Sequence, residues 1–180
     1  MKLYSTHQKV QNVSIQEAVL QGLAKDGGLF MPQEIPSLLT SFFTNLSEMN
    51  WQEIAFSVAQ NLLGNDIEKN TLQKIVSESL NFDIPLVKLD ENIHVLELFH
   101  GNTLAFKDVG ARFMARLLGH FIEKQQKNET TYILAATSGD TGSAVASGFH
   151  NVPNVEVILL YPKGMVSHIQ EQQLTTYEGN

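Results

Sequence analysis

The chain has 180 residues, of which 43% are apolar and 17% charged, enough for one sizeable core or for one domain and part of another. Its net charge of -7 disfavours a broad surface for nucleic acid or an anionic membrane. The absence of cysteine excludes disulfides, thiolate metal sites and a thiol nucleophile. We see neither a signal peptide nor an apolar run long enough to span a membrane, and expect a cytoplasmic protein.

The N-terminal part of the chain is predicted to be mostly helical. Capping boxes in "SIQE" (14–17) and "NWQE" (50–53) each precede apolar residues at helical spacing. Gly64 stands where the second of these helices would end, and a third helix is expected over 71–80.

Beyond Pro85, short apolar runs alternate with helical stretches. The runs are "IHVLEL", "TYILAAT" and "VEVILLY", and alternation of this kind predicts the parallel sheet of an α/β fold. We therefore expect a mostly helical N-terminal region, residues 1–88, followed by an incomplete parallel-sheet α/β domain, residues 89–180.

The helices of this second region are marked by their spacing. Apolar residues recur every four positions after Lys107, at Val109, Phe113, Leu117 and Phe121. Arg112 lies off that stripe, and further helices are predicted over 141–149 and 167–177. Three strands make a narrow parallel sheet, and the chain stops on "YEGN" where another strand and helix would begin. We therefore expect the N-terminal portion of a larger enzyme.

The turn "ATSGDTGSAVASG" (136–148) follows one of these strands. It brings backbone N–H groups and hydroxyls to the start of a helix, an arrangement that suits a carboxylate or phosphate. The same residues also fit a capped turn with Asp140 or Thr141 as the N-cap. Neither a P-loop nor a G-x-G-x-x-G pattern is present. The residues alone leave anion binding and simple capping open, although α/β sheets bind ligands at such turns.

Lys107 in "GNTLAFKD" (101–108) is the second candidate. In the first turn of a helix, the positive end of the dipole disfavours a charged amine, and covalent chemistry with a carbonyl requires a neutral one. Asp108 opposes that trend. A lysine whose stem packs while its ammonium reaches water is the common alternative.

The six histidines show no metal-binding spacing, so no metal site is expected. His100 is a candidate because it follows a strand close to Lys107. Lys163 in "LYPKG" follows another strand, where it could meet an anion. For both residues, an ordinary surface position is the alternative.

Several long motifs recur in one order along nearly the whole chain. They are "MKLYST", "SIQEAVLQGLAKDGGLFMP", "LELFHGNTLAFKD", "ATSGDTGSAVASGF" and "VILLYPKGMVSHIQEQQLTT". Together they resemble the threonine synthase family, pyridoxal-phosphate (PLP) enzymes of the tryptophan synthase β type, and are most similar to its bacterial branch. The resemblance implies a PLP-dependent domain of fold type II. It also implies the conversion of O-phospho-L-homoserine and water to L-threonine and phosphate.

The same resemblance implies roles for individual residues. Lys107 would be the catalytic residue and would hold PLP covalently. The other cofactor-binding residues would be Phe106 and Asp140. The substrate-binding residues would be Ser138, Gly139 and Thr141, with Thr137, His100 and Lys163 as further candidates. The implied partner is a small anionic amino acid rather than nucleic acid or a membrane, and self-association stays open.

Two features depart from the family pattern. Asn102 stands where the family usually has proline, which is expected to loosen the approach to Lys107. The glycine-rich loop for the PLP phosphate and the residue that faces the pyridine nitrogen belong to a later part of the pattern. We therefore expect an incomplete cofactor cradle and a chain that is inactive alone. The alternatives are a non-catalytic α/β fragment or binding module, and a related PLP-dependent serine or threonine dehydratase.

Overall fold

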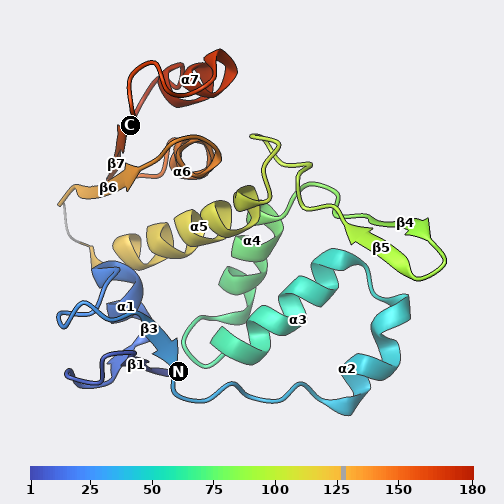
Figure 1. Ribbon diagram of the computed structural model, residues 1–180. Coiled ribbons are helices and arrows are strands. Elements are labelled where there is room, and N and C mark those ends of the chain that lie inside the picture. The colour runs from blue at the N-terminus through green and yellow to red at the C-terminus, as the bar shows by residue number, and fades with distance from the viewer. Residues whose placement is uncertain (127–128) are drawn as a thin grey trace. The chain divides into compact units, whose positions relative to one another are not determined.

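The computed structural model describes residues 1–126 and 129–180. The chain divides into two compact units, Met1–Ser77 and Glu78–Asn180, which Figure 1 colours from blue to red along the sequence. The domain limits expected from the sequence, 1–88 and 89–180, stay a prediction. Within the described ranges, no helix combines the length and the apolar character needed to cross a membrane.

The first unit combines a small antiparallel sheet with helices. Its elements are β1 (Lys2–Ser5), β2 (Val13–Ser14), α1 (Ile15–Gln21), β3 (Phe30–Pro32), α2 (Thr40–Asn45), the 3-10 helix η1 (Leu46–Glu48), α3 (Trp51–Leu63) and the start of α4 (Lys69–Ser79). The strand order is β2-β1-β3, and Leu3 pairs with Val13 on one side and Pro32 on the other. Leu72 of α4 is fully buried.

Both predicted capping boxes are confirmed. Ser14 Oγ accepts from the N–H of Glu17 at 3.2 Å, and the Glu17 carboxylate accepts from the N–H of Ser14 at 2.8 Å. Asn50 and Glu53 make the same reciprocal pair at the start of α3, at 2.9 and 2.8 Å. Gly64 ends α3 as predicted. Each box satisfies N–H groups that a helix start leaves without partners.

The second unit contains one parallel pair of strands joined through a helix. Its elements are β4 (Leu86–Asp90), β5 (Ile93–Leu96), α5 (Lys107–Gln125), β6 (Thr131–Ala136), α6 (Asp140–Phe149), β7 (Val155–Leu160) and α7 (His168–Thr175). β6 and β7 pair in parallel from Thr131↔Val155 to Ala136↔Leu160. This mixed fold with its parallel pair matches the predicted α/β class. The helices predicted over 141–149 and 167–177 are confirmed as α6 and α7, whose bounds differ by at most two residues from those expected.

The run "IHVLEL" does not join the parallel sheet, and that prediction was wrong. It forms β5, which pairs antiparallel with β4 through Leu86↔Leu96 and Val87↔Val95. Only Glu91 and Asn92 separate the two strands, so a local hairpin closes with little loss of chain entropy. A run of apolar residues shows that a strand forms, but it does not show which partner that strand takes.

The predicted apolar stripe of α5 is confirmed in part. Leu117 and Phe121 are buried, whereas Val109 and Phe113 are half-buried. Arg112, which lies off the stripe, is also buried. Its guanidinium donates to the backbone oxygen of Glu78 at 2.8 Å and to the Asn81 side chain at 2.6 Å. The helix is therefore buried on more than the face that its apolar spacing indicates.

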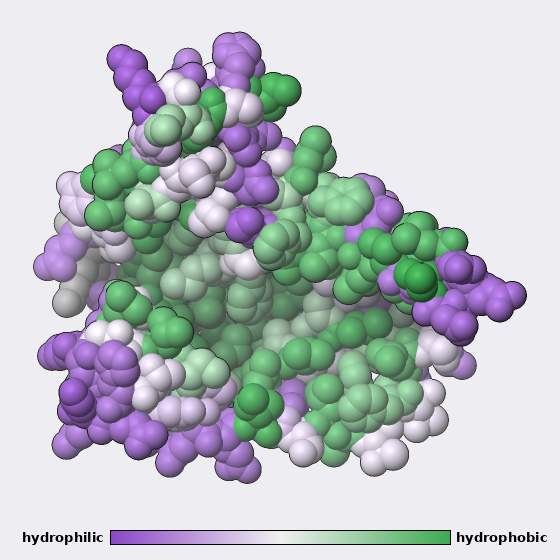
Figure 2. All heavy atoms as spheres, viewed as in Figure 1, coloured by the Kyte–Doolittle hydropathy of each residue, from purple (hydrophilic) through white to green (hydrophobic). Residues whose placement is uncertain are grey.

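One face of the β6–β7 pair is exposed and apolar. Tyr132 and Leu134 of β6 are each 65% exposed, and Ile158 and Leu160 of β7 are 44% and 54% exposed. Parallel sheets are normally covered on both faces. Hydrophobic residues also reach the surface in many places on the face of the molecule that Figure 2 shows.

Helices α5 and α6 pack against each other (Figure 1), and their backbones come close at Gly148. A Cβ atom on Gly148 would lie 3.0 Å from the carbonyl carbon of Ala111 and 3.2 Å from the backbone nitrogen of Arg112. Backbone atoms inside a helix cannot move aside as a flexible side chain can. Gly148 therefore lets α6 approach the first turns of α5.

Replacing Gly148 by alanine is expected to destabilise the protein by about 1 to 2 kcal/mol, because overpacking outweighs the gain in helix propensity. Gly110 of α5 is the matched control, since a Cβ atom there meets nothing within 4 Å. Gly110→Ala is expected to stabilise the protein by about 0.5 to 1 kcal/mol. Urea unfolding followed by circular dichroism measures both changes. Equal stabilisation by the two variants would contradict the close helix contact.

Candidate functional site

Most of the residues singled out from the sequence border one cavity in the second unit. The cavity has a volume of about 370 Å³ and is lined by Lys107, residues 136–141 and Gln170. It lies where β6 ends and where α5 and α6 begin. Open α/β sheets bind their ligands beyond the carboxyl ends of their strands. The structure thus brings Lys107 and the loop after β6 to one place.

Thr137 organises the loop between β6 and α6. Its hydroxyl oxygen accepts from the N–H groups of Gly139 at 3.1 Å and Gly142 at 2.9 Å, and its O–H donates to the Gly139 carbonyl at 3.0 Å. Gly139 is the N-cap of α6, so the expectation that Asp140 or Thr141 would cap the helix was wrong. The Thr137 hydroxyl performs the capping role from outside the helix, which leaves the side chains of Asp140 and Thr141 exposed.

The start of α6 offers backbone donors to a ligand. Asp140 and Thr141 are its first two residues, and N–H groups at these positions have no partner within the helix. The positive end of the helix dipole lies at the same place. Gly139 is buried, and a Cβ atom there would lie 2.6 Å from Nε2 of Gln170. Glycine at 139 therefore leaves room for the Gln170 amide, and the loop can receive an anion.

Lys107 is the first residue of α5, as predicted, and is half-buried. Its Nζ lies 4.5 Å from the centre of the Phe106 ring, in the range of a cation–π contact. Phe106 itself is 59% exposed. The amine is thus accessible from the cavity, with an aromatic face beside it.

Asp108 holds the loop that precedes Lys107. Its carboxylate is fully buried and accepts from the Thr103 N–H at 2.8 Å and the Thr103 hydroxyl at 2.7 Å. A Cβ atom on Gly101 would lie 2.5 Å from Asp108 Oδ2, so the chain passes directly over the carboxylate. Sequence reasoning treated Asp108 only as a charge beside Lys107. The threonine five residues before it is the signal that could have indicated this role.

Asn102 is tied into the structure around Lys107. Its side chain accepts from Arg112 at 3.2 Å and donates to Ser147 Oγ at 3.4 Å. These contacts oppose the loosening expected at this position.

Burial lowers the pKa of the Arg112 guanidinium and nearby Arg116 lowers it further, whereas the Asp108 carboxylate raises it.

Three candidates do not line the cavity. Phe106 lies beside Lys107, as described above. His100 contacts the Glu97 carboxylate at 2.7 Å and is exposed, and Lys163 is exposed on the segment after β7. The roles of these three residues stay predictions. Conversely, sequence reasoning missed Gln170, whose only sequence signal was the helix-start pattern "SHIQ".

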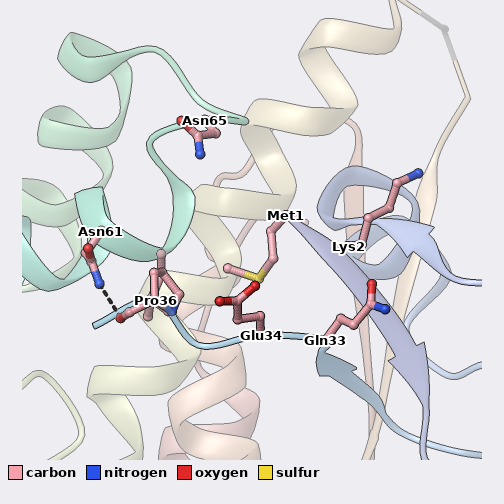
Figure 3. Close-up of a pocket in the computed structure, with 8 residues that line it drawn as sticks. Met1, Lys2, Gln33, Glu34, Pro36, Asn61 and Asn65 are labelled. Carbon is pink, nitrogen blue, oxygen red and sulfur yellow. Dashed lines mark hydrogen bonds between the residues drawn. The ribbon is translucent and has the colours of Figure 1, made fainter. Parts of the chain in front are cut away.

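A second cavity of about 380 Å³ lies in the first unit (Figure 3). Asn61 donates to the backbone oxygen of Pro36 at 2.7 Å across one side of it, and the Lys2 ammonium points away from Glu34. Throughout the described ranges, no group of three or more His, Cys, Asp or Glu side chains could hold a metal ion. None of the sequence-predicted site residues lines this cavity.

Comparison with known proteins supports the assignment of the motifs. Residues 2–80 match the family model described as the threonine synthase N terminus. The threonine synthase of Buchnera aphidicola subsp. Baizongia pistaciae is 42% identical over 181 residues, which cover 100% of this chain and 42% of the relative. That of Escherichia coli K12 is 38% identical over 180 residues, covering 100% of this chain and 41% of the relative.

Solved structures agree with the sequence relatives. The crystal structure of threonine synthase from Escherichia coli matches with a TM-score of 0.88 at 38% identity, covering 99% of this chain and 41% of that one. PLP-bound threonine synthase from Brucella melitensis matches with a TM-score of 0.89 at 37% identity, covering 96% of this chain and 38% of that one.

The fold is that of the N-terminal part of an α/β enzyme of fold type II. Within that class, the chain is similar along its whole length to the N-terminal portion of threonine synthases. It spans about 42% of the length of the curated relatives it matches.

Proposed function

We propose that this chain provides the reactive lysine and the substrate-binding loop of a PLP-dependent threonine synthase. The reaction converts O-phospho-L-homoserine and water to L-threonine and phosphate. One observation carries the proposal: Lys107 and residues 136–141 line the same cavity. The proposal includes a cytoplasmic location, which a cysteine-free composition suits.

The residues present fit PLP at one end of that cofactor. The half-buried residue Lys107 brings a primary amine to a cavity of about 370 Å³, and an aromatic ring lies beside the amine. Lys107, Phe106 and Asp140 would hold the cofactor there. When bound, PLP supplies electron withdrawal that stabilises negative charge on substrate carbon atoms.

The chain's own residues have separate tasks in this proposal. Ser138, Gly139 and Thr141 bind the substrate carboxylate through N–H groups and hydroxyls at the start of α6, where the helix dipole favours an anion. Lys107, a positioned amine, moves protons at the substrate carbons. The local donors also explain how a chain of net charge -7 receives an anionic substrate.

Chemical trapping tests the cofactor part of the proposal. The chain is incubated with PLP, reduced with sodium borohydride, digested and mapped by mass spectrometry. A pyridoxyl group on Lys107 in preference to the other lysines is the expected result, because Lys107 is half-buried and its amine lies beside the cavity, in place for the carbonyl. Labelling spread over the exposed lysines, with no preference for Lys107, would contradict the proposal.

Two competing functions give different outcomes. A serine or threonine dehydratase would act on threonine and leave O-phospho-L-homoserine intact. Because the chain alone is expected to be inactive, assays of both compounds with the full-length protein separate the enzymes. A non-catalytic binding module would bind the amino acid with neither labelling of Lys107 nor phosphate release. The relatives and the solved structures compared above are threonine synthases, which favours the first function.

A further inference from the structure

Helix α7 contacts both loops of the candidate site. Gln170 donates from Nε2 to Asp140 Oδ1 at 3.1 Å, and Gln173 donates from Nε2 to the backbone oxygen of Thr103 at 3.5 Å. Asp140 belongs to the loop after β6, and Thr103 belongs to the loop before Lys107. One short helix therefore contacts both the loop after β6 and the loop before Lys107.

The direction of the Gln170 amide is fixed by its neighbours. Its Oε1 accepts from the backbone N–H of Ser167 at 3.4 Å and from the Ser167 hydroxyl at 3.2 Å. A backbone N–H only donates, so the oxygen must face Ser167 and the nitrogen must face Asp140. The capping box of α7 thus orients the Gln170 amide so that its nitrogen donates to the Asp140 carboxylate, which can only accept.

Gln170 also occupies space beside the loop. A Cβ atom on Gly139 would lie 2.6 Å from its Nε2 and 3.2 Å from its Cδ. The side chain therefore packs against the loop backbone at 139 while it donates to residue 140. Both contacts fall on residues that the proposed function places at the substrate and the cofactor.

We propose that Gln170 is a positioning residue that sets the place of Asp140 and Gly139 in the site. Its consequence for ligand binding rests on the proposed function, whereas its effect on the loop does not. Gln170 carries this role because its amide links the cap of α7 to the start of α6.

Gln170→Glu tests this role without removing the helix cap. Glutamate is the common residue at this position of a capping box, so α7 keeps its start. The side chain loses its donor, and two carboxylates then face each other near Asp140. Gln172→Glu, at an exposed position of the same helix, is the matched control for charge.

Amide hydrogen exchange at Gly139 and Gly142 measures the loop with no cofactor present. Gln170→Glu is expected to raise their exchange rates about fivefold, and Gln172→Glu is expected to leave them unchanged. Adding Asp140→Asn to Gln170→Glu restores the hydrogen bond in the opposite direction, because the amide at position 140 then donates to the carboxylate at position 170. The exchange rates are therefore expected to return toward those of the parent. Urea unfolding midpoints are expected to stay equal, which separates this role from a general loss of stability.

A spectroscopic titration with PLP then gives the ligand readout. The apparent affinity is expected to fall in Gln170→Glu and to stay unchanged in Gln172→Glu. Equal exchange rates in the two single variants, or exchange rates that do not recover in the double variant, would overturn the positioning role. Failure of PLP to bind the parent chain would count against the proposed function instead, and the exchange comparison would still decide the role of Gln170.

Discussion

Lys107→Ala is expected to reduce borohydride trapping of PLP to background. The amine of Lys107 is half-buried at the edge of the cavity, and alanine leaves no group there that can bond to a carbonyl carbon. Any phosphate release from O-phospho-L-homoserine is expected to fall to background in the same variant. Intact-mass spectrometry after reduction measures the trapped fraction.

Two further variants make this result specific. Lys124→Ala removes an exposed lysine from the last turn of the same helix and is expected to keep full trapping. Lys107→Arg keeps a positive charge but provides a guanidinium that stays protonated, so it is expected to trap nothing. Trapping that persists in Lys107→Ala would remove the basis of the proposed function.

Asp108→Ala is expected to destabilise the protein by about 3 kcal/mol. The substitution removes a buried carboxylate that accepts from the N–H and the hydroxyl of Thr103. Both donors then remain buried without their partner, and the loop before Lys107 loses its main polar anchor. We also expect slower trapping of PLP, because the amine is no longer held beside the cavity.

Urea unfolding of Asp108→Ala and Asp83→Ala measures this effect. Asp83 lies in the same unit and is exposed, so its replacement is expected to change stability by less than about 0.5 kcal/mol. Asp108→Asn is expected to fall between the two, since its amide oxygen keeps one acceptor. Equal stability of Asp108→Ala and Asp83→Ala would show that the Thr103 contacts contribute little.

The sequence predicted the elements whose signals are local. The capping boxes at Ser14 and Asn50 depend on residues three positions apart, and the structure forms both. The helix that begins at Lys107 and the strand–helix–strand unit from 131 to 160 follow equally from short-range spacing. Local sequence patterns are enough to predict an element when residues nearby in the sequence satisfy its polar groups.

The features that sequence reasoning missed depend on which partner a residue takes, whether that partner is near in the chain or far from it. The pairing of "IHVLEL" with the preceding strand, the cap that Thr137 provides for α6, and the contact of Gln170 with Asp140 each join residues with no common periodicity. The burial of Arg112 depends likewise on Glu78 and Asn81, more than thirty positions earlier in the chain. Such pairs become visible only when the fold places them together.

The contact between Gly148 and Ala111 limits how closely the two helices of the site can approach each other. Ala111 lies one helical turn after Lys107, and the other end of α6 carries the N–H groups that we propose bind the substrate carboxylate. Because backbone meets backbone there, α6 cannot approach α5 more closely at this point. The contact therefore sets the least possible separation between the helix that begins with Lys107 and the helix that begins after the 137–139 loop.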